Sequence, residues 1–170
     1  MKELFLDIET TGLDPHTGQI IEIAIVDGTG RCLLSTRYNI DQTLQTPEEI
    51  QSALDYNKLS LDELSLYRPL DADEIIFIAT LLKNSLVIAH NFEFDKAFLE
   101  QTSLRLTAQN LFKSVKWNCT MQRLAKSKGI KSGRVKLPNM QSHNVPHSSL
   151  HDCQNARLLW QSFTPQDWNW

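Results

Sequence analysis

The chain begins with a short segment in which apolar and polar positions alternate. Leu4, Leu6 and Ile8 alternate with positions that include Asp7 and Glu9, and successive side chains of a strand point to opposite faces. The pattern predicts a strand with an apolar face, and it places both carboxylates side by side at its end. Neighbouring carboxylates repel each other, and a hard divalent cation between them is the usual remedy. A solvent-exposed strand end is the alternative, and a short motif alone does not decide between them.

The next segments predict a meander of antiparallel strands. Residues 19–26 form a nearly continuous apolar run, as expected for a strand that is covered on both faces. A turn at residues 27–30, Asp-Gly-Thr-Gly, separates it from a third strand at residues 31–38. Because short connections join neighbouring strands, we expect these three strands to lie side by side.

Strand and helix patterns alternate in the rest of the chain. We expect helices from residue 47 and over residues 71–82, a loop over residues 55–69, a buried strand at 86–89, a helix from Asn91 to about residue 105, a strand at 115–119, a helix at 120–128, an irregular segment at 135–147, and a last helix beginning at residue 148 or 149. A meander followed by alternating helices and strands indicates an α/β fold, with a mixed sheet and helices on its faces. If the 86–89 strand lies parallel beside the first strand, their carboxyl ends meet where ligands bind in such sheets.

Length and composition are those of one compact domain. The chain has 170 residues, of which 41% are apolar, enough for a hydrophobic core. We expect one domain over residues 1–163 and an aromatic tail over residues 164–170. Neither a membrane span nor a signal peptide is recognised, so a cytoplasmic location is expected. The three cysteines form no Cys-x-x-Cys pair and are expected to be reduced and buried.

Basic residues are concentrated in one part of an acidic chain. The net charge is −3, yet residues 113–136 contain eight Lys and Arg and no acid, and residues 1–112 hold 18 of the 20 acids. We call these eight residues the basic stripe: Lys113, Lys116, Arg123, Lys126, Lys128, Lys131, Arg134 and Lys136. A local stripe of this kind can follow a phosphate backbone. A solvated helix face and loop is an equal alternative.

Two further acids lie near the starts of predicted helices. Asp95 lies where an acid favours the helix dipole, and Asp152 lies three residues after Ser149, where it could close a capping box. Together with Asp7 and Glu9, they place four carboxylates at the ends of apolar elements. Two divalent cations that catalyse a phosphoryl displacement need such a set.

A histidine near these acids could act as a general base. An imidazole with an ordinary pKa can accept a proton from an attacking water near neutral pH. Chemistry alone does not choose among His143, His147 and His151.

The order and spacing of these residues resemble a known family. The segments Asp7-Ile8-Glu9-Thr10-Thr11-Gly12-Leu13-Asp14-Pro15, His90-Asn91-x-x-Phe94-Asp95 and His147-x-x-x-x-Asp152 are similar to the three exonuclease motifs of the DEDDh 3′→5′ exonucleases. This family includes the epsilon proofreading subunit of bacterial replicative DNA polymerase and ribonuclease T. The similarity covers nearly the whole chain, and three ordered motifs are far more specific than any one of them.

The resemblance implies an RNase H-like fold and removal of nucleotides from the 3′ end of DNA or RNA as nucleoside 5′-monophosphates. By motif position, Asp7, Glu9, Asp95 and Asp152 would bind two Mg²⁺ or Mn²⁺ ions, and His147 would be the general base. Candidates for holding the terminal nucleotide are Thr10, Thr11, Gly12, Leu13 as an apolar wedge, and Asn91, which with Phe94 is expected chiefly to shape the start of its helix.

The chain departs from the family pattern at two places. Cys119 precedes Thr120 where many members have an aspartate, and residues 55–64 lack the His-Gly-Ile-Thr sequence that is often found there. Neither change removes a candidate metal ligand. Both leave open the subfamily and the choice between DNA and RNA, which depends on a few contacts to the 2′-hydroxyl.

Three functional hypotheses follow from the sequence. The first is a metal-dependent exonuclease acting on single-stranded 3′ ends. The second is a non-catalytic nucleic-acid-binding domain that uses the basic stripe and the aromatic residues 163–170, which the presence of all four acids and His147 disfavours. The third is an exonuclease module that receives its substrate from a polymerase or another replication or repair partner docked on the tail.

Overall fold

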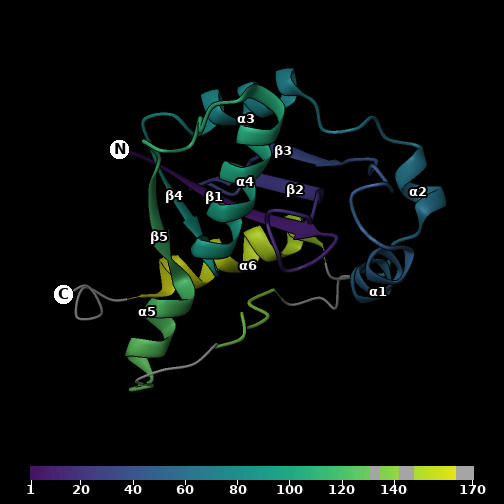
Figure 1. Cartoon of the computed structure of the whole chain (residues 1–170). Coiled ribbons are helices and arrows are strands. Elements are labelled where there is room, and N and C mark those ends of the chain that lie inside the picture. The colour runs from purple at the N-terminus through teal and green to yellow at the C-terminus, as the bar shows by residue number, and fades with distance from the viewer. Residues whose placement is uncertain (131–134, 142–147, 164–170) are drawn as a thin grey trace.

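A mixed sheet lies at the centre of the molecule (Figure 1). The structure is a computed structural model that describes residues 1–130, 135–141 and 148–163. Within these residues the five strands are β1 (Lys2–Thr10), β2 (Ile20–Asp27), β3 (Cys32–Arg37), β4 (Ser85–Ala89) and β5 (Lys116–Cys119), in the order β3-β2-β1-β4-β5. β1 pairs antiparallel with β2 and parallel with β4. The predicted mixed sheet, with the 86–89 strand parallel to the first, is therefore confirmed.

Helices cover both faces of this sheet. In the described part of the chain they are α1 (Pro47–Asn57), α2 (Leu61–Ser65), α3 (Ala72–Leu82), α4 (Phe92–Thr107), α5 (Thr120–Ser127) and α6 (Ser149–Ser162). α3 and α4 pack on one face, and α6 crosses the other face beneath β1 and β2 (Figure 1). α1 and α2 lie beyond the carboxyl end of β1, and α5 extends away from the end of β5 (Figure 1).

The alternation of side chains along β1 divides the interior into two cores. Leu4, Leu6 and Ile8 pack with apolar residues of α3 and α4. Phe5 points to the other face and packs with Cys153 and the rest of the apolar stripe of α6. Burial of both sets removes apolar surface from water and fixes the strand between two helical layers. Residues 7 and 9 follow Phe5 at two-residue spacing, so their side chains point toward α6.

The structure corrects two predictions. The loop expected over residues 55–69 is wrong, because α1 extends to Asn57 and the short helix α2 forms at residues 61–65. A capping box between Ser60 and Glu63 starts that helix. Of the three cysteines, Cys32 is exposed, because it lies on β3 at the edge of the sheet.

The expected aromatic tail, residues 164–170, lies outside the described residues. No described helix combines the length and the apolar character needed to cross a bilayer. Residues 135–141 contain neither helix nor strand, as predicted for the described part of the irregular segment.

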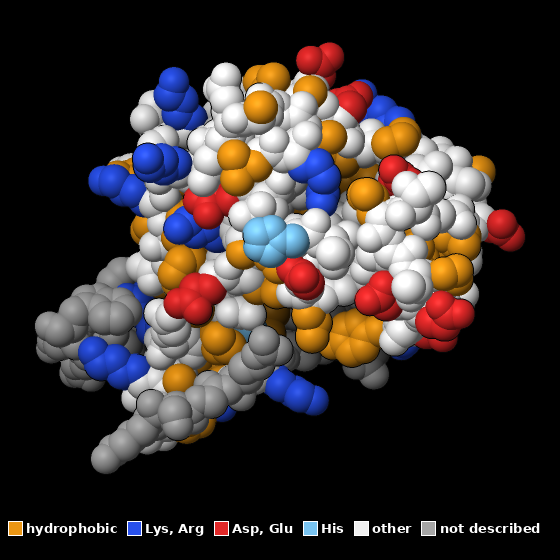
Figure 2. All heavy atoms as spheres, in the orientation of Figure 1, with side chains coloured by type: hydrophobic (Ala, Val, Ile, Leu, Met, Phe, Trp, Pro, Cys, Tyr) orange, Lys and Arg blue, Asp and Glu red, His pale blue; other side chains and the backbone are white. Residues whose placement is uncertain are grey.

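The basic stripe separates into exposed and buried members. Its exposed described members are Lys113, Lys116, Lys126, Lys128 and Lys136, and Figure 2 shows Lys and Arg side chains gathered on the left of this face, over β5 and α5. Arg123 is only 1% exposed. Its guanidinium lies 4.1 Å from the ring centroid of Trp160 and 5.2 Å from that of Phe163. Arg123 therefore joins α5 to α6, and the expectation that it contacts phosphates as part of the basic stripe is wrong. Lys131 and Arg134 lie outside the described residues.

Candidate active site

Three carboxylates from two elements meet at the carboxyl end of β1. Asp7, Glu9 and Asp152 each offer an oxygen that lies within 4.8 Å of the others. Two-residue spacing on β1 directs Asp7 and Glu9 toward α6, and the first turn of α6 supplies Asp152. The packing of α6 on the sheet thus brings together acids that are far apart in the sequence.

Asp95 approaches this trio from α4, on the other side of the sheet. Asp95 is only 4% exposed, and the backbone N–H groups of Asp95 itself and of Ile8 lower the pKa of its carboxyl in opposition to burial. Among the described residues, only Asp7, Glu9 and Asp152 form a group of three such side chains with oxygens within 4.8 Å of one another. Asp95 nevertheless repels Asp7 more strongly than Glu9 or Asp152 does. It therefore faces the acidic site, and the helix dipole alone does not account for its position.

Burial and repulsion raise the pKa of two of these carboxyls. The pKa of Asp7 lies well above its ordinary value, first because burial disfavours the charged form and then because Asp95, Glu9 and Asp152 repel it. Burial is also the main cause that raises the pKa of Asp95 to about 8. A divalent cation would relieve this repulsion. The donors are hard carboxylate oxygens, which suit Mg²⁺ or Mn²⁺ better than a soft metal.

The start of α6 determines where Asp152 lies. Ser148 is the N-cap, and its side-chain oxygen accepts a hydrogen bond from the His151 N–H at 3.3 Å. Asp152 is consequently the fourth residue of the helix, one position too late for a capping box. The capping-box alternative is wrong, and the Asp152 carboxylate instead joins the acids of β1.

A buried glutamate that the sequence analysis did not single out lies beside the trio. Glu22 faces Glu9 across the β1–β2 ladder and is 6% exposed. Its Oε1 accepts hydrogen bonds from the Ser149 N–H at 2.7 Å and from the Ser149 hydroxyl at 2.8 Å. Its Oε2 accepts one from Arg37 Nε at 2.8 Å. The available signal was a carboxylate within an apolar strand, since a buried charge requires partners.

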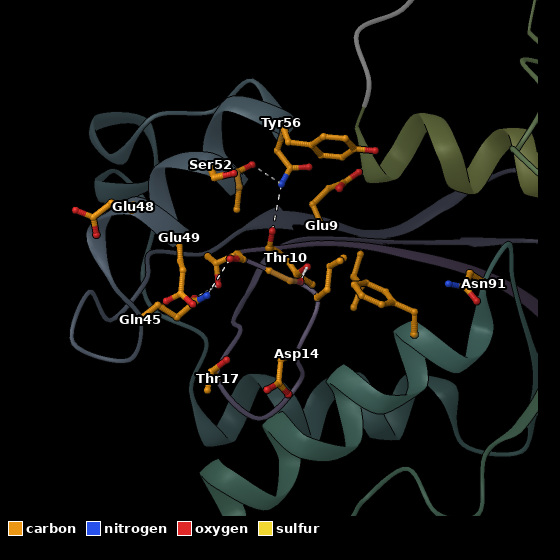
Figure 3. A pocket seen from close by; sticks show the side chains of 17 residues that line it. Glu9, Thr10, Asp14, Thr17, Gln45, Glu48, Glu49, Ser52, Tyr56 and Asn91 are labelled. Carbon is orange, nitrogen blue, oxygen red and sulfur yellow. Dashed lines mark hydrogen bonds between the residues drawn. The ribbon is translucent and has the colours of Figure 1, made fainter. Parts of the chain in front are cut away.

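A cavity of about 890 Å³ opens beside Glu9 (Figure 3). The loop after β1 forms one side of it and α1 another. All five residues expected to hold a nucleotide line it, namely Thr10, Thr11, Gly12, Leu13 and Asn91. The side chain of Leu13 is 78% exposed and is therefore free to contact a ligand.

Hydrogen bonds hold the loop after β1 against α1 and the segment before it. The Gln45 side-chain amide donates to the Thr11 carbonyl at 3.0 Å, and its oxygen accepts from the Thr11 hydroxyl. Asn57 donates to the Thr10 carbonyl at 3.2 Å. Gly12 leaves room for this arrangement, because a Cβ there would lie 3.2 Å from the Gln45 amide nitrogen. These bonds preform one wall of the cavity.

α1 contributes residues that the sequence analysis missed. Ser52, Tyr56 and Asn57 line the cavity, and Figure 3 shows Tyr56 and Glu9 on the same side, near the start of α6. Tyr56 is 77% exposed. No motif marked this segment, because its sequence lacks the His-Gly-Ile-Thr pattern that would have drawn attention to it.

The turn between β4 and α4 has two roles. Asn91 occupies the N-cap position of α4 but makes no capping hydrogen bond with its side chain, and it lines the cavity instead. His90 lies 2.9 Å through Nδ1 from the Thr120 hydroxyl and 2.6 Å through Nε2 from the Val135 carbonyl. A carbonyl can only accept, so Nε2 carries the proton and Nδ1 accepts from Thr120. Burial lowers the pKa of His90, in agreement with a neutral ring.

Only one of the three candidate histidines belongs to the described residues. The ring Nδ1 of His151 lies 3.1 Å from the side-chain nitrogen of Gln141, which also donates to the His151 carbonyl at 3.2 Å. His143 and His147 lie outside the described residues. The assignment of His147 as general base therefore stays a prediction.

The chain is similar to proteins of one known family. Residues 4–159 match the RNase T family, which is described as exonuclease. The DNA polymerase III subunit epsilon of Rickettsia prowazekii is 31% identical over 102 residues, which cover 58% of this chain and 43% of that protein. The same subunit of Buchnera aphidicola is 30% identical over 106 residues, covering 59% and 44%. The chain thus spans less than half the length of the curated relatives that it matches.

Solved structures share the fold. E. coli Exonuclease I in complex with a dA16 oligonucleotide superimposes with a TM-score of 0.75 at 12% identity, over 98% of this chain and 42% of that one. Exonuclease I from Methylocaldum szegediense gives a TM-score of 0.71 at 12% identity, over 99% and 42%. The RNase H-like fold is therefore confirmed. Because its residues 4–159 match the family and its motifs follow the same order, the chain belongs to the exonuclease family, in the DEDDh 3′→5′ group.

Proposed function

We propose that this chain is a divalent-metal-dependent 3′→5′ exonuclease that removes nucleoside 5′-monophosphates from single-stranded nucleic acid. One observation carries the proposal: the carboxylates of Asp7, Glu9 and Asp152 meet within 4.8 Å, and Glu9 also lines a cavity of about 890 Å³. That volume lies within the range of small-ligand sites, about 300–1,000 Å³. Acids and cavity together provide a place for a terminal nucleotide and its phosphodiester.

The four motif acids are the residues that would hold the metal. We assign Asp7, Glu9, Asp95 and Asp152 to two Mg²⁺ or Mn²⁺ ions, supported by their hard oxygen donors and by the repulsion that raises the pKa of Asp7. When bound, such ions stabilise negative charge on the attacking and leaving oxygens of a phosphoryl displacement.

The remaining residues orient the substrate and move protons. The loop at residues 10–13 holds the terminal nucleotide, with Leu13 against its base and Asn91 on another wall of the cavity. His147 accepts a proton from the attacking water, whose oxygen forms a bond to phosphorus. The bond from phosphorus to the preceding 3′-oxygen breaks, that oxygen takes up a proton, and the terminal nucleotide leaves as a 5′-monophosphate.

Single-stranded DNA is the substrate class that we propose first. Solved relatives are complexes of Exonuclease I with dA16 and dT13 oligonucleotides, and the curated relatives are subunits of a DNA polymerase. The exposed lysines of the basic stripe can contact phosphates outside the cavity. Single-stranded RNA is the alternative substrate, and its hydrolysis is compared with that of DNA.

The exonuclease domain is proposed to end near residue 163. The rings of Phe163 and Trp160 are packed edge to face, with centroids 6.5 Å apart, so Phe163 belongs to the domain. A polymerase or repair partner would dock on residues 164–170. Deleting those seven residues is expected to leave the hydrolysis of free strands unchanged, and a loss of activity or solubility would show that the tail packs on its own domain.

The test of the function uses a 3′-labelled single strand of DNA with Mg²⁺. We expect labelled nucleoside 5′-monophosphate to appear, and EDTA to abolish it. Single-stranded RNA and recessed duplex ends, run in parallel, rank the substrates. A strand that stays intact in Mg²⁺ contradicts the proposal, and equal binding of unshortened DNA with Mg²⁺ and with EDTA would support the non-catalytic binding domain.

A matched pair of variants ties the activity to the site. Asp7→Ala is expected to abolish digestion while the protein stays folded, because removal of this carboxylate relieves its repulsion by Asp95, Glu9 and Asp152. The control is Asp73→Asn, which removes an exposed acid from the first turn of α3. Equal activity of both variants would show that the reaction does not depend on the acidic trio.

A further inference from the structure

The carboxylate of Glu22 joins strand β2 to the first turn of α6. It accepts two hydrogen bonds from Ser149, from the backbone N–H at 2.7 Å and from the hydroxyl at 2.8 Å. Ser149 is the first residue of α6 and is fully buried. The first N–H groups of a helix lack intrahelical partners, and a negative charge is favourable there. Glu22 therefore satisfies a buried donor that the helix itself cannot satisfy.

Both oxygens of Glu22 are already engaged. Oε1 accepts both hydrogen bonds from Ser149, and Oε2 accepts one from Arg37 Nε at 2.8 Å. Arg37 balances the buried charge and also comes within 4.0 Å of Glu63. Three donors are directed at its two oxygens, which makes Glu22 a poorer ligand for a cation. The oxygens of Asp7 and Glu9 meet that of Asp152 instead.

The position of Ser149 determines the position of Asp152. Residues three apart in an α-helix lie on neighbouring positions of one face, so an anchor at Ser149 fixes the face of α6 that carries Asp152. On the sheet side, Glu22 faces Glu9 in the β1–β2 register. The β1–β2 pairing therefore places Glu9, which belongs to the trio, and also Glu22, which holds the first turn of α6. That turn carries Asp152, another member of the trio.

We propose that Glu22 is a positioning residue that holds the first turn of α6 so that Asp152 meets the carboxylates of β1. This inference rests on the proposed metal-dependent function. Groups that orient metal ligands typically change metal affinity or activity by about 10- to 100-fold when they are lost. A displacement of about 1 Å in a catalytic group can reduce the rate by about 100-fold.

Two substitutions of Glu22 separate the effect of side-chain length from the effect of charge. Glu22→Gln keeps the length of the side chain and an oxygen that can accept from Ser149. It removes the charge and sets an amide nitrogen, which cannot accept, against Arg37 Nε. Glu22→Asp keeps the charge but shortens the side chain by one methylene, so the carboxylate no longer reaches Ser149. If position is what matters, Glu22→Asp is the more damaging change.

The matched control loosens the same helix at its other end. Glu3 Oε1 accepts a hydrogen bond from Trp160 Nε1 at 3.2 Å, and Glu3→Asp shortens that contact far from the first turn. Three readouts are taken for each variant: Mn²⁺ affinity by calorimetry, amide hydrogen exchange of residues 149–153, and kcat and KM on single-stranded DNA. The first two do not depend on catalysis.

For Glu22→Asp we expect Mn²⁺ affinity and kcat to fall by about 10- to 100-fold, exchange at residues 149–153 to become faster, and KM to change little. Glu3→Asp is expected to stay near the wild type, and Glu22→Gln to lose less Mn²⁺ affinity than Glu22→Asp. Unchanged Mn²⁺ affinity and exchange in Glu22→Asp overturn the inference, and so does a loss confined to Glu22→Gln, which would indicate a role for charge.

The inference can still be tested if Glu22→Asp does not fold or if the wild type lacks nuclease activity. If Glu22→Asp does not fold, Ser149→Ala replaces it, because it removes one of the two donors; Mn²⁺ affinity equal to the wild type would overturn the inference. If the wild type lacks nuclease activity, the proposed function fails, while Mn²⁺ affinity and exchange still decide whether Glu22 positions Asp152.

Discussion

Asp7→Asn is expected to stabilise the metal-free protein while it abolishes activity. The Asp7 carboxylate is crowded by those of Glu9 and Asp152, whose oxygens lie within 4.8 Å, and by Asp95. At that upper limit of 4.8 Å, two unit charges repel by about 3.5 kcal/mol at an effective dielectric constant of about 20, and by about 0.9 kcal/mol in bulk water. Asparagine keeps the shape of the side chain and removes the charge.

The net gain should be smaller than the sum of the pairs. Protonation of the carboxyls already relieves part of the repulsion, since burial and neighbouring charges raise the pKa of Asp7. We therefore expect about 1–3 kcal/mol in the free energy of unfolding. For a chain of this size that corresponds to a rise of about 3–9 °C in Tm.

The assay is thermal unfolding at pH 7.5 and low salt, first in EDTA and then with Mn²⁺. In EDTA, Asp7→Asn should melt above the wild type, and Asp73→Asn should not. Mn²⁺ at about 100 times its dissociation constant should stabilise the wild type by about 2.7 kcal/mol and the Asp7→Asn variant far less. An Asp7→Asn protein that melts below the wild type in EDTA, or equal stabilisation of both proteins by Mn²⁺, would refute the reasoning.

Three other substitutions probe the cavity and the packing around it. Leu13→Ala, at an exposed position, should leave the unfolding free energy within about 0.5 kcal/mol but raise KM about fivefold, through the loss of about 1 kcal/mol of apolar contact; an unchanged KM would remove Leu13 from the nucleotide site. Gly18→Ala would place a Cβ 2.8 Å from the Asp14 carbonyl oxygen. It should cost about 1–3 kcal/mol in denaturant titrations, and a neutral result would show that the loop yields. Arg123→Ala removes the cation stacked on Trp160 and should cost about 2–4 kcal/mol, whereas a cost below about 0.5 kcal/mol would place Arg123 among the solvated members of the basic stripe.

Local patterns predicted the parts of the fold that local physics decides. The alternation along β1 gave the two faces of that strand, and the apolar run at residues 86–89 gave the buried strand beside it. The short helix α2 was not predicted. Its five residues bury only Leu64, and a single buried position produces no periodic pattern.

The site was predicted less completely, because several of its contacts join distant segments. The pattern at Asp7 and Glu9 predicted a pair of acids, but it gave no indication that Glu22 would hold the helix that carries Asp152. Arg123 had the composition of a solvated stripe, yet aromatic rings of α6 and of the residue after it enclose its guanidinium. Tertiary packing decides such cases, and charge counting along the chain cannot anticipate it.

The central claim is that the acids of β1 and α6 form a divalent-metal site. The most direct measurement is anomalous diffraction from crystals soaked in Mn²⁺. The account predicts anomalous density in contact with the carboxylates of Asp7, Glu9 and Asp152, and its disappearance in Asp152→Asn crystals. Density at other positions, with none between these three carboxylates, would contradict it.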